Sequence, residues 1–139
     1  MKLAYIIGSY PALTTTFIDR EILLLQAWGV DLKVVSIRRS KSKLSAEQVA
    51  IQQGVTYLLP VNIWHLLTAH LFFATRQFRT FWETLFYLLK RPHPNLKARL
   101  KTILHLGEGV YAAYWLRNGG YEHIHAHFAD RAATVAMVA

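Results

Sequence analysis

The sequence predicts an α/β protein with a Rossmann-like, doubly wound parallel sheet. Short apolar runs typical of buried strands alternate with stretches whose apolar residues recur at helical spacing. Glycine, proline or a helix-capping residue marks most changes from one pattern to the next. Hydrophobic residues make up 53% of the chain and charged residues 17%, so there is enough apolar surface for a folded core.

The first strand is expected over Leu3–Ile7, a continuous apolar run of the kind that is buried on both faces of a sheet. Gly8–Pro11 has the composition of a turn. Thr14–Thr16 then offers an N-cap to a helix over Phe17–Trp28, in which apolar residues recur at helical spacing. Gly29 stands where a C-terminal cap glycine is expected.

The second strand is expected over Leu32–Ile37, which is rich in β-branched residues and completes a βαβ unit. A basic, serine-containing loop follows at Arg38–Lys43. Ser45 begins a short helix that ends at Gly54, because glutamine and glutamate follow near the capping-box position. Val55–Leu59 is the third expected strand, and a proline stops it.

The middle of the chain, Val61–Arg117, has a helical pattern with one predicted break at Pro92–Pro94. Apolar residues from Leu96 to Tyr114 recur on one face, which predicts a single buried stripe along that helix. A fourth strand is expected at His123–Phe128, and a helix of small residues at Arg131–Ala139.

Two segments are expected to lie at the ligand-binding edge of this sheet. Ligands of open parallel sheets bind beyond the carboxyl ends of the strands, at the point where the strand order reverses. In the usual strand order the first and fourth strands are neighbours there, so Gly8–Thr16 and Ala126–Ala132 should meet at one crevice. The first segment lacks the G-x-G-x-x-G pattern of nicotinamide-binding proteins, and taken alone it is an ordinary capped turn.

Three histidines alternate along the fourth strand, at positions 123, 125 and 127. Strand geometry predicts that they share one face, with Ile124, Ala126 and Phe128 on the other. His-x-His on a strand can supply two metal ligands, but no carboxylate or cysteine cluster accompanies it, and we expect no metal. The alternatives are that His127 contacts a ligand hydroxyl or phosphate, or that the histidines are simply half-buried.

Read together, Tyr10–Ile22, Leu25–Gly29, Val34–Arg38 and His123–Ala136 resemble glycosyltransferase family 4, in particular exopolysaccharide and colanic-acid sugar transferases. The resemblance implies a GT-B enzyme with two Rossmann-like domains. Residues 1–139 correspond to the N-terminal, mainly acceptor-binding domain, and the nucleotide-sugar domain is expected to be absent, leaving this portion inactive alone. It also implies metal-independent transfer with retention, no cofactor besides the nucleotide-sugar substrate, and a glycan or lipid-linked acceptor.

The resemblance also assigns candidate residues. His127 is the catalytic candidate, in contact with donor sugar or acceptor. The substrate-binding candidates are Gly8 and Ser9 near the donor phosphates, Thr15 and Thr16 lining the cleft, and His125. Thr14–Thr15 stands where the family has Ser-Glu, so an acidic role there is lost or relocated. Arg20 and Glu21 match the motif, and a local ion pair between them is the favoured interpretation.

The chain is basic, with a formal charge of +8 and seven histidines counted as neutral, which indicates an anionic partner. Basic residues and aromatic residues interleave between Trp64 and Arg117. This pattern predicts either peripheral membrane contact or an ordinary solvated face over an aromatic core. No nucleic-acid-binding motif is present, so no nucleic-acid partner is expected.

No segment is long and apolar enough for a predicted membrane span, and no cysteine is present to form disulfides. The expected location is the cytoplasm, at the inner face of the membrane if the basic helices bind it. The alternative to an enzyme is a non-catalytic Rossmann-like module that binds a membrane surface or a partner protein.

Overall fold

Four parallel strands form the centre of the fold in a computed structural model that describes residues 1–128 and 130–139. The strands are β1 (Lys2–Ser9), β2 (Asp31–Arg38), β3 (Thr56–Tyr57) and β4 (His123–Ala126). Their order across the sheet is β3-β2-β1-β4. The chain therefore adds β2 and then β3 on one side of β1, and β4 pairs with the other side of β1. This α/β arrangement is compatible with a Rossmann-like fold, and the predicted adjacency of the first and fourth strands is confirmed.

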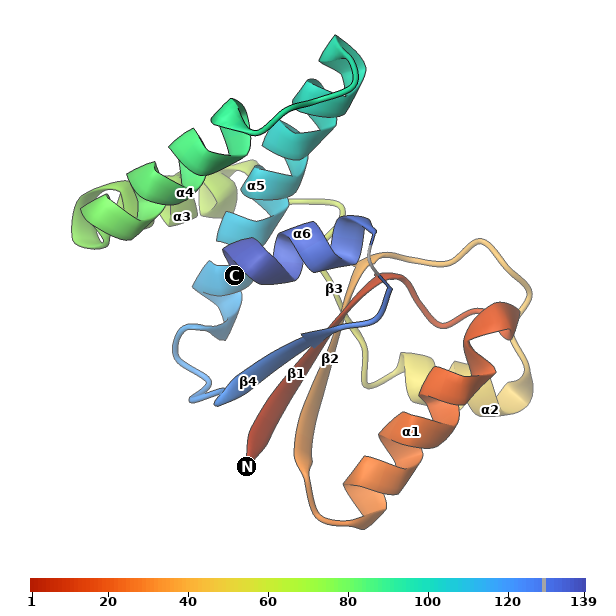
Figure 1. Ribbon diagram of the computed structural model, residues 1–139. Helices are drawn as coiled ribbons and strands as arrows, with labels where there is room; N and C mark the ends of the chain where they lie inside the picture. Colours follow the sequence, from red (N-terminus) through yellow and green to blue (C-terminus); the bar gives the residue numbers. More distant parts are fainter. Residues whose placement is uncertain (129) are drawn as a thin grey trace.

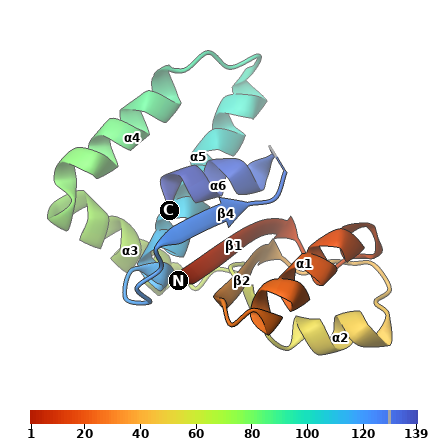
Figure 2. The ribbon, with the colours of Figure 1, turned by 60° about the horizontal axis from the view of Figure 1, so that its bottom comes forward.

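Helices cover both faces of the sheet (Figures 1 and 2). One face carries α1 (Thr16–Ala27), which follows a single 3-10 turn at Leu13–Thr15, and α2 (Ala46–Gln52). The other face carries α6 (Arg131–Val138) and the second half of α5 (Leu96–Leu116). The remaining helices, α3 (Ile63–Arg76) and α4 (Phe78–Lys90), extend away from the sheet together with the first half of α5.

Local capping follows the sequence closely at two helix ends. Gly29 adopts a left-handed φ of 77°, and the N–H of Val30 reaches back to the carbonyl of Leu25 at 3.0 Å, which closes a Schellman motif. At α2, Ser45 Oγ accepts from the N–H of Gln48 at 3.2 Å, and the Gln48 side chain accepts from the N–H of Ser45 at 3.3 Å. The predicted cap glycine and capping box are both confirmed.

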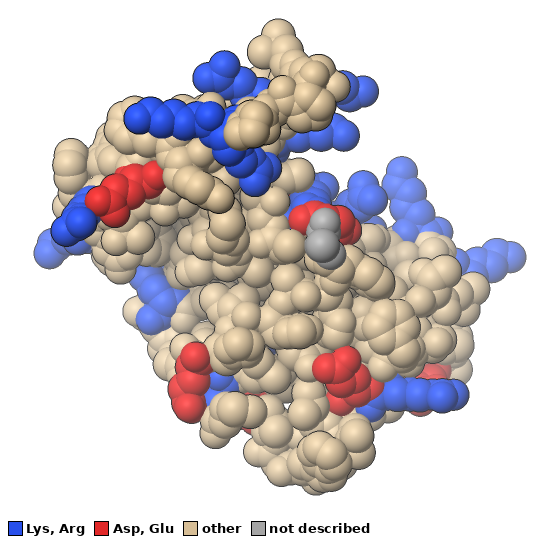
Figure 3. All heavy atoms as spheres, viewed as in Figure 1, with Lys and Arg blue, Asp and Glu red and all other residues tan. Residues whose placement is uncertain are grey.

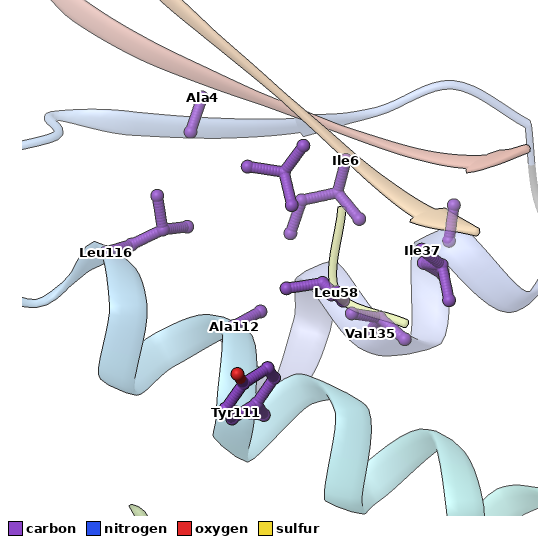
Figure 4. Packing of buried hydrophobic residues seen from close by; sticks show 10 residues of the cluster. Ala4, Ile6, Ile37, Leu58, Tyr111, Ala112, Leu116 and Val135 are labelled. Carbon is purple, nitrogen blue, oxygen red and sulfur yellow. The ribbon is translucent and has the colours of Figure 1, made fainter. Parts of the chain in front are cut away.

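Both faces of β1 are buried, as its continuous apolar run predicts. Ala4 and Ile6 face a core formed with β2, α5 and α6 (Figure 4). Leu3, Tyr5 and Ile7 face the second core, which lies under α1. Because successive side chains of β1 point to opposite faces of the sheet, this one strand contributes to both hydrophobic cores.

The long helical region departs from its prediction in two places. The chain breaks at Gln77, which has φ −123° and ψ 47°, as well as at the prolines. This reversal lets α4 pack on α3 and α5 through a third core that includes Leu88 and Leu106. The apolar stripe predicted along α5 is buried only in the second half of the helix. In the first half, Leu96 and Leu100 are 79% and 59% exposed.

Two strands are shorter than predicted. The third strand covers Thr56–Tyr57, although the N–H groups of Leu58 and Leu59 still donate to β2 carbonyls at 3.0 and 2.9 Å. The fourth strand ends at Ala126, and Phe128 has a left-handed φ of 71°. Among the helices of residues 1–128 and 130–139, none is both long and apolar enough to cross a membrane.

Candidate functional site

The loops that follow β1 and β4 meet at the carboxyl edge of the sheet. The two strands pair in parallel with Tyr5 opposite His125 and Ile6 opposite Ala126, so the next residues of both leave the sheet side by side. The β2 strand, on the other side of β1, ends there with Arg38. This edge is the position at which open α/β sheets bind ligands.

A network of buried polar groups fixes the β1–α1 loop. Tyr10 is fully buried, and its hydroxyl donates to the Asp19 carboxylate at 2.6 Å. Gln48 of α2 donates to the same carboxylate at 2.8 Å and to the carbonyl of Ala12 at 2.9 Å. The N–H of Tyr10 donates to Ser36 Oγ of β2 at 3.0 Å. Burial and the Asp19 carboxylate raise the pKa of Tyr10, so its hydroxyl stays protonated and the loop is held rigidly.

A cleft of about 670 Å³ opens above this loop. Gly8 and Ser9 form part of its floor, and the β2–α2 loop contributes Arg38, Arg39 and Lys41. A methyl group at Gly8 would lie 3.5 Å from the Asp130 carboxylate that caps α6, which is ordinary contact. The side chains that line the cleft include three cations, Arg38, Arg39 and Lys41, and one carboxylate, Asp130. This excess of positive charge suits an anionic ligand.

The threonines of the loop do not cap α1 as predicted. Thr15 lines the cleft but is buried, and its hydroxyl accepts from the N–H of Ala12 at 3.0 Å and donates to the same residue's carbonyl at 2.8 Å. That exchange forms the 3-10 turn, and no side-chain hydrogen bond caps α1. Thr16 begins α1, is exposed and does not line the cleft.

Beside the cleft, His127 belongs to a cluster of polar rings and a carboxylate. Its ring lies 4.7 Å from that of Tyr5 and 4.8 Å from that of His125, centroid to centroid. Tyr5 donates a hydrogen bond of 2.5 Å to Glu21 of α1. The other oxygen of Glu21 lies 3.8 Å from His127 Nε2. The predicted shared face of His125 and His127 is thus confirmed. Glu21 of α1 contacts Tyr5 and His127 on this face, whereas His125 is exposed.

His127 has the properties of a neutral residue poised for a polar contact. It is 8% exposed, and burial lowers its pKa despite the opposing effect of Glu21. Its Nε2 atom is buried and makes no hydrogen bond to any described residue. A buried nitrogen without a partner is costly, so this atom is available to a ligand hydroxyl or a water molecule.

An aromatic pair separates this cluster from the cleft. Phe17 and Phe128 both line the cleft and contact each other edge to face, with ring centroids 6.0 Å apart. The Phe17 ring also lies 6.3 Å from that of His127. The prediction that Phe128 shares a face with Ile124 is wrong, because the left-handed turn after β4 redirects its side chain.

The structure therefore brings Gly8, Ser9 and Thr15 together in one cleft. His127 lies next to Phe17 of the cleft lining, whereas His125 is exposed and does not line the cleft. Glu21 belongs to the His127 cluster instead of forming the expected ion pair with its neighbour in sequence.

Sequence reasoning missed Tyr5, the contacts of Glu21 with Tyr5 and His127, and the cleft-lining role of the basic loop. Tyr5 could have been found, because parallel pairing of the first and fourth strands places it opposite His125 on the same face. Asp19 gave no such signal, since its role depends on Gln48, which lies 29 residues further along the chain.

No group of three or more His, Asp or Glu side chains gathers for a metal ion within residues 1–128 and 130–139. Comparison with protein-family models, with curated proteins and with solved structures gives no match.

Proposed function

We propose that this domain takes part in sugar transfer, as the N-terminal portion of a retaining, metal-independent glycosyltransferase of the GT-B type in polysaccharide biosynthesis. Such an enzyme moves a sugar from a nucleotide-sugar donor to a glycan or lipid-linked acceptor. The observation that carries the proposal is the cationic cleft at the junction of β1 and β4. Tyr10–Ile22 and His123–Ala136, the two strand-end segments that resemble glycosyltransferase family 4, both contribute residues to it, and so does Arg38.

The lining of the cleft suits a diphosphate. Gly8 carries no side chain, so a ligand can approach the backbone at the end of β1. Arg38 and Lys41 are exposed cleft residues, whereas Arg39 stacks over the Tyr57 ring at 4.4 Å. Arginine forks and lysine ammonium groups are the usual protein donors to phosphate oxygens. The rigid loop network means that little ordering is needed when a ligand binds.

In this proposal, His127 is the residue that recognises the sugar. Its Nε2 makes no hydrogen bond to a described residue, and its ring lies 6.3 Å from that of Phe17, which is 51% exposed and lines the cleft. The proposal requires the Phe17 ring to move aside for a sugar to reach this histidine. A neutral imidazole can accept from or donate to a sugar hydroxyl, and the lowered pKa keeps it neutral at pH 7. Glu21 is positioned to favour the tautomer with hydrogen on Nε2.

The test is titration of the ¹⁵N-labelled chain with UDP-glucose and GDP-mannose, and with UDP alone, followed by NMR. We expect amide shifts at Gly8 and Ser9 with all three ligands. The ring nitrogens of His127 should shift only when the sugar is present. Lys41→Gln should weaken binding by about tenfold, the effect of one lost charge-assisted contact. Lys43→Gln is the matched control, because it removes the same charge from the same loop outside the cleft.

The proposal is wrong if none of the three ligands shifts the Gly8 and Ser9 amides. It is also wrong if Lys43→Gln weakens binding as much as Lys41→Gln, because the attraction would then be a general effect of net charge. Shifts at the cleft without any response of His127 would remove the histidine from sugar recognition.

A further inference from the structure

A second cleft, of about 740 Å³, lies on the opposite face of the sheet from α1. It is bounded by α3, by the first half of α5 and by the chain leaving β3, and Arg38 borders both this cleft and the one described above. Its volume is in the range of small-molecule sites in proteins. Of its lining, the proposed sugar transfer uses only Arg38.

An ion pair neutralises Glu108, the only carboxylate among the described residues that line this cleft. Glu108 of α5 is 8% exposed, and Arg131 of α6 donates to both of its oxygens, with the Nε contact at 2.8 Å. A bidentate pair of this kind leaves no net charge at the floor of the cleft. The carboxylate therefore does not repel an incoming anion.

Two further cations line the cleft without an ion pair to any described residue. They are Arg38 at the end of β2 and Lys101 of α5. His105 is close to them, and burial lowers its pKa, so it is a neutral hydrogen-bonding group at pH 7. The cleft thus presents a net positive charge of two, and Figure 3 shows more lysine and arginine side chains gathered beyond it, over the α4–α5 connection.

Apart from the charged residues and two histidines, His70 and His105, the lining is apolar, and it continues onto an uncovered surface. Leu66 of α3 and Leu104 of α5 form opposite walls, and Leu104 is 63% exposed. Leu100 and Leu96, one and two turns earlier in α5, extend this strip away from the sheet. On α3, Leu67 beside the cleft is 54% exposed. Contiguous apolar strips that are left uncovered on a protein surface mark interaction sites.

We propose that this cleft binds a phosphate group carried on an apolar chain, as in an anionic lipid. The phosphate contacts Lys101 and Arg38, and the chain lies along Leu104 and Leu100. An inorganic anion would leave the leucines uncovered, and a neutral apolar ligand would bury two cations without a partner. Only a ligand with both parts matches the whole lining. This inference does not depend on sugar transfer.

The experiment uses the full chain and dihexanoyl phosphatidic acid, a soluble lipid, with binding measured by calorimetry. Inorganic phosphate tests the anion alone, and dihexanoyl phosphatidylcholine tests the chains with a zwitterionic head group. We expect phosphatidic acid to bind at least about tenfold more tightly than either. Vesicles of phosphatidylcholine with and without phosphatidic acid then test whether the same site operates at a membrane surface.

Matched variants locate the site. Lys101→Gln should weaken binding of phosphatidic acid by about tenfold. Arg99→Gln removes the same charge from the same helix outside the cleft and should change the affinity by less than about twofold. Leu104→Asn should weaken binding, whereas Leu24→Asn, at an exposed position of α1 on the other face of the sheet, should leave it nearly unchanged.

Three results would overturn the proposal. Equal affinity for inorganic phosphate would show an anion site that does not recognise the chain. Equal effects of Arg99→Gln and Lys101→Gln would show general electrostatic attraction. Binding to anionic vesicles without binding to the soluble lipid would show surface adsorption in place of a cleft. Circular dichroism of each variant confirms that a loss of binding is not a loss of folding.

Discussion

Two glycines in α5 provide a sharp test of how this helix packs. Gly107 and Gly109 both lie in the helix interior, where glycine lowers helix stability by roughly 0.5–1 kcal/mol relative to alanine. Replacing either by alanine should therefore be favourable if nothing occupies the space of the added methyl group. The surroundings of the two positions differ, and they predict opposite outcomes.

At Gly107 the added methyl group has room. The nearest atom that it would meet is His70 Cε1 at 3.9 Å, which is ordinary van der Waals contact. We expect Gly107→Ala to raise the free energy of unfolding by about 0.5–1 kcal/mol. For a chain of this length, that gain corresponds to an increase in Tm of roughly 2–4 °C.

At Gly109 the methyl group meets α6. It would lie 2.5 Å from Val138 Cβ and 3.0 Å from the Val135 carbonyl oxygen. Neither atom can move without shifting the α6 backbone, and overpacking of this kind costs about 2–3 kcal/mol. This cost exceeds the gain in helix propensity, so we expect Gly109→Ala to lower the free energy of unfolding by about 1–2 kcal/mol.

Urea unfolding followed by circular dichroism measures both variants against the unmodified chain. Combining Gly109→Ala with Val138→Ala, which removes a methyl group 2.6 Å from the new one, should recover part of the loss. If Gly109→Ala stabilises the chain as much as Gly107→Ala does, α6 does not pack on α5 at this point, and the reasoning fails.

Burial lowers the pKa of His127 below its ordinary value of about 6.5. Just below pH 6.5, His127 therefore binds a proton in the unfolded chain but not in the folded chain. The free energy of unfolding should consequently fall as the pH falls. His127→Gln should reduce that slope, and an unchanged slope would show that this histidine is not buried as described. Arg131→Met should cost about 3 kcal/mol, because it leaves the Glu108 carboxylate buried and unpaired; adding Glu108→Gln should restore much of the loss in urea unfolding. Tyr10→Phe should cost about 1–3 kcal/mol, because the buried Asp19 carboxylate loses a donor at 2.6 Å, and a change in Tm of less than about 1 °C would argue against a rigid β1–α1 loop.

Local patterns in the sequence were sufficient to predict most elements of the sheet layer. The apolar runs of β1 and β2, the cap glycine after α1 and the capping box of α2 depend on neighbouring residues, and the structure has all of them. The parallel topology also places the β1 and β4 loops together, because crossover connections leave few alternatives.

The helical region was less predictable because its boundaries depend on tertiary contacts. The break at Gln77 contains no glycine or proline, and it is stabilised by the core that α3, α4 and α5 share. Leu96 and Leu100 follow the same periodicity as the buried residues later in α5, but no element covers them. Periodicity identifies an apolar face without showing whether another part of the protein covers it.

The sequence by itself determined the strands, the main helices and which loops meet at the carboxyl edge of the sheet, because spacing and turn chemistry act over a few residues. Only the tertiary structure joined Glu21 to Tyr5 and His127, and Gln48 to Asp19. It alone also decided that Thr15 completes a turn while Thr16 is exposed and lies outside the cleft lining. These contacts join residues on different elements, and their geometry exists only once the helices have packed on the sheet.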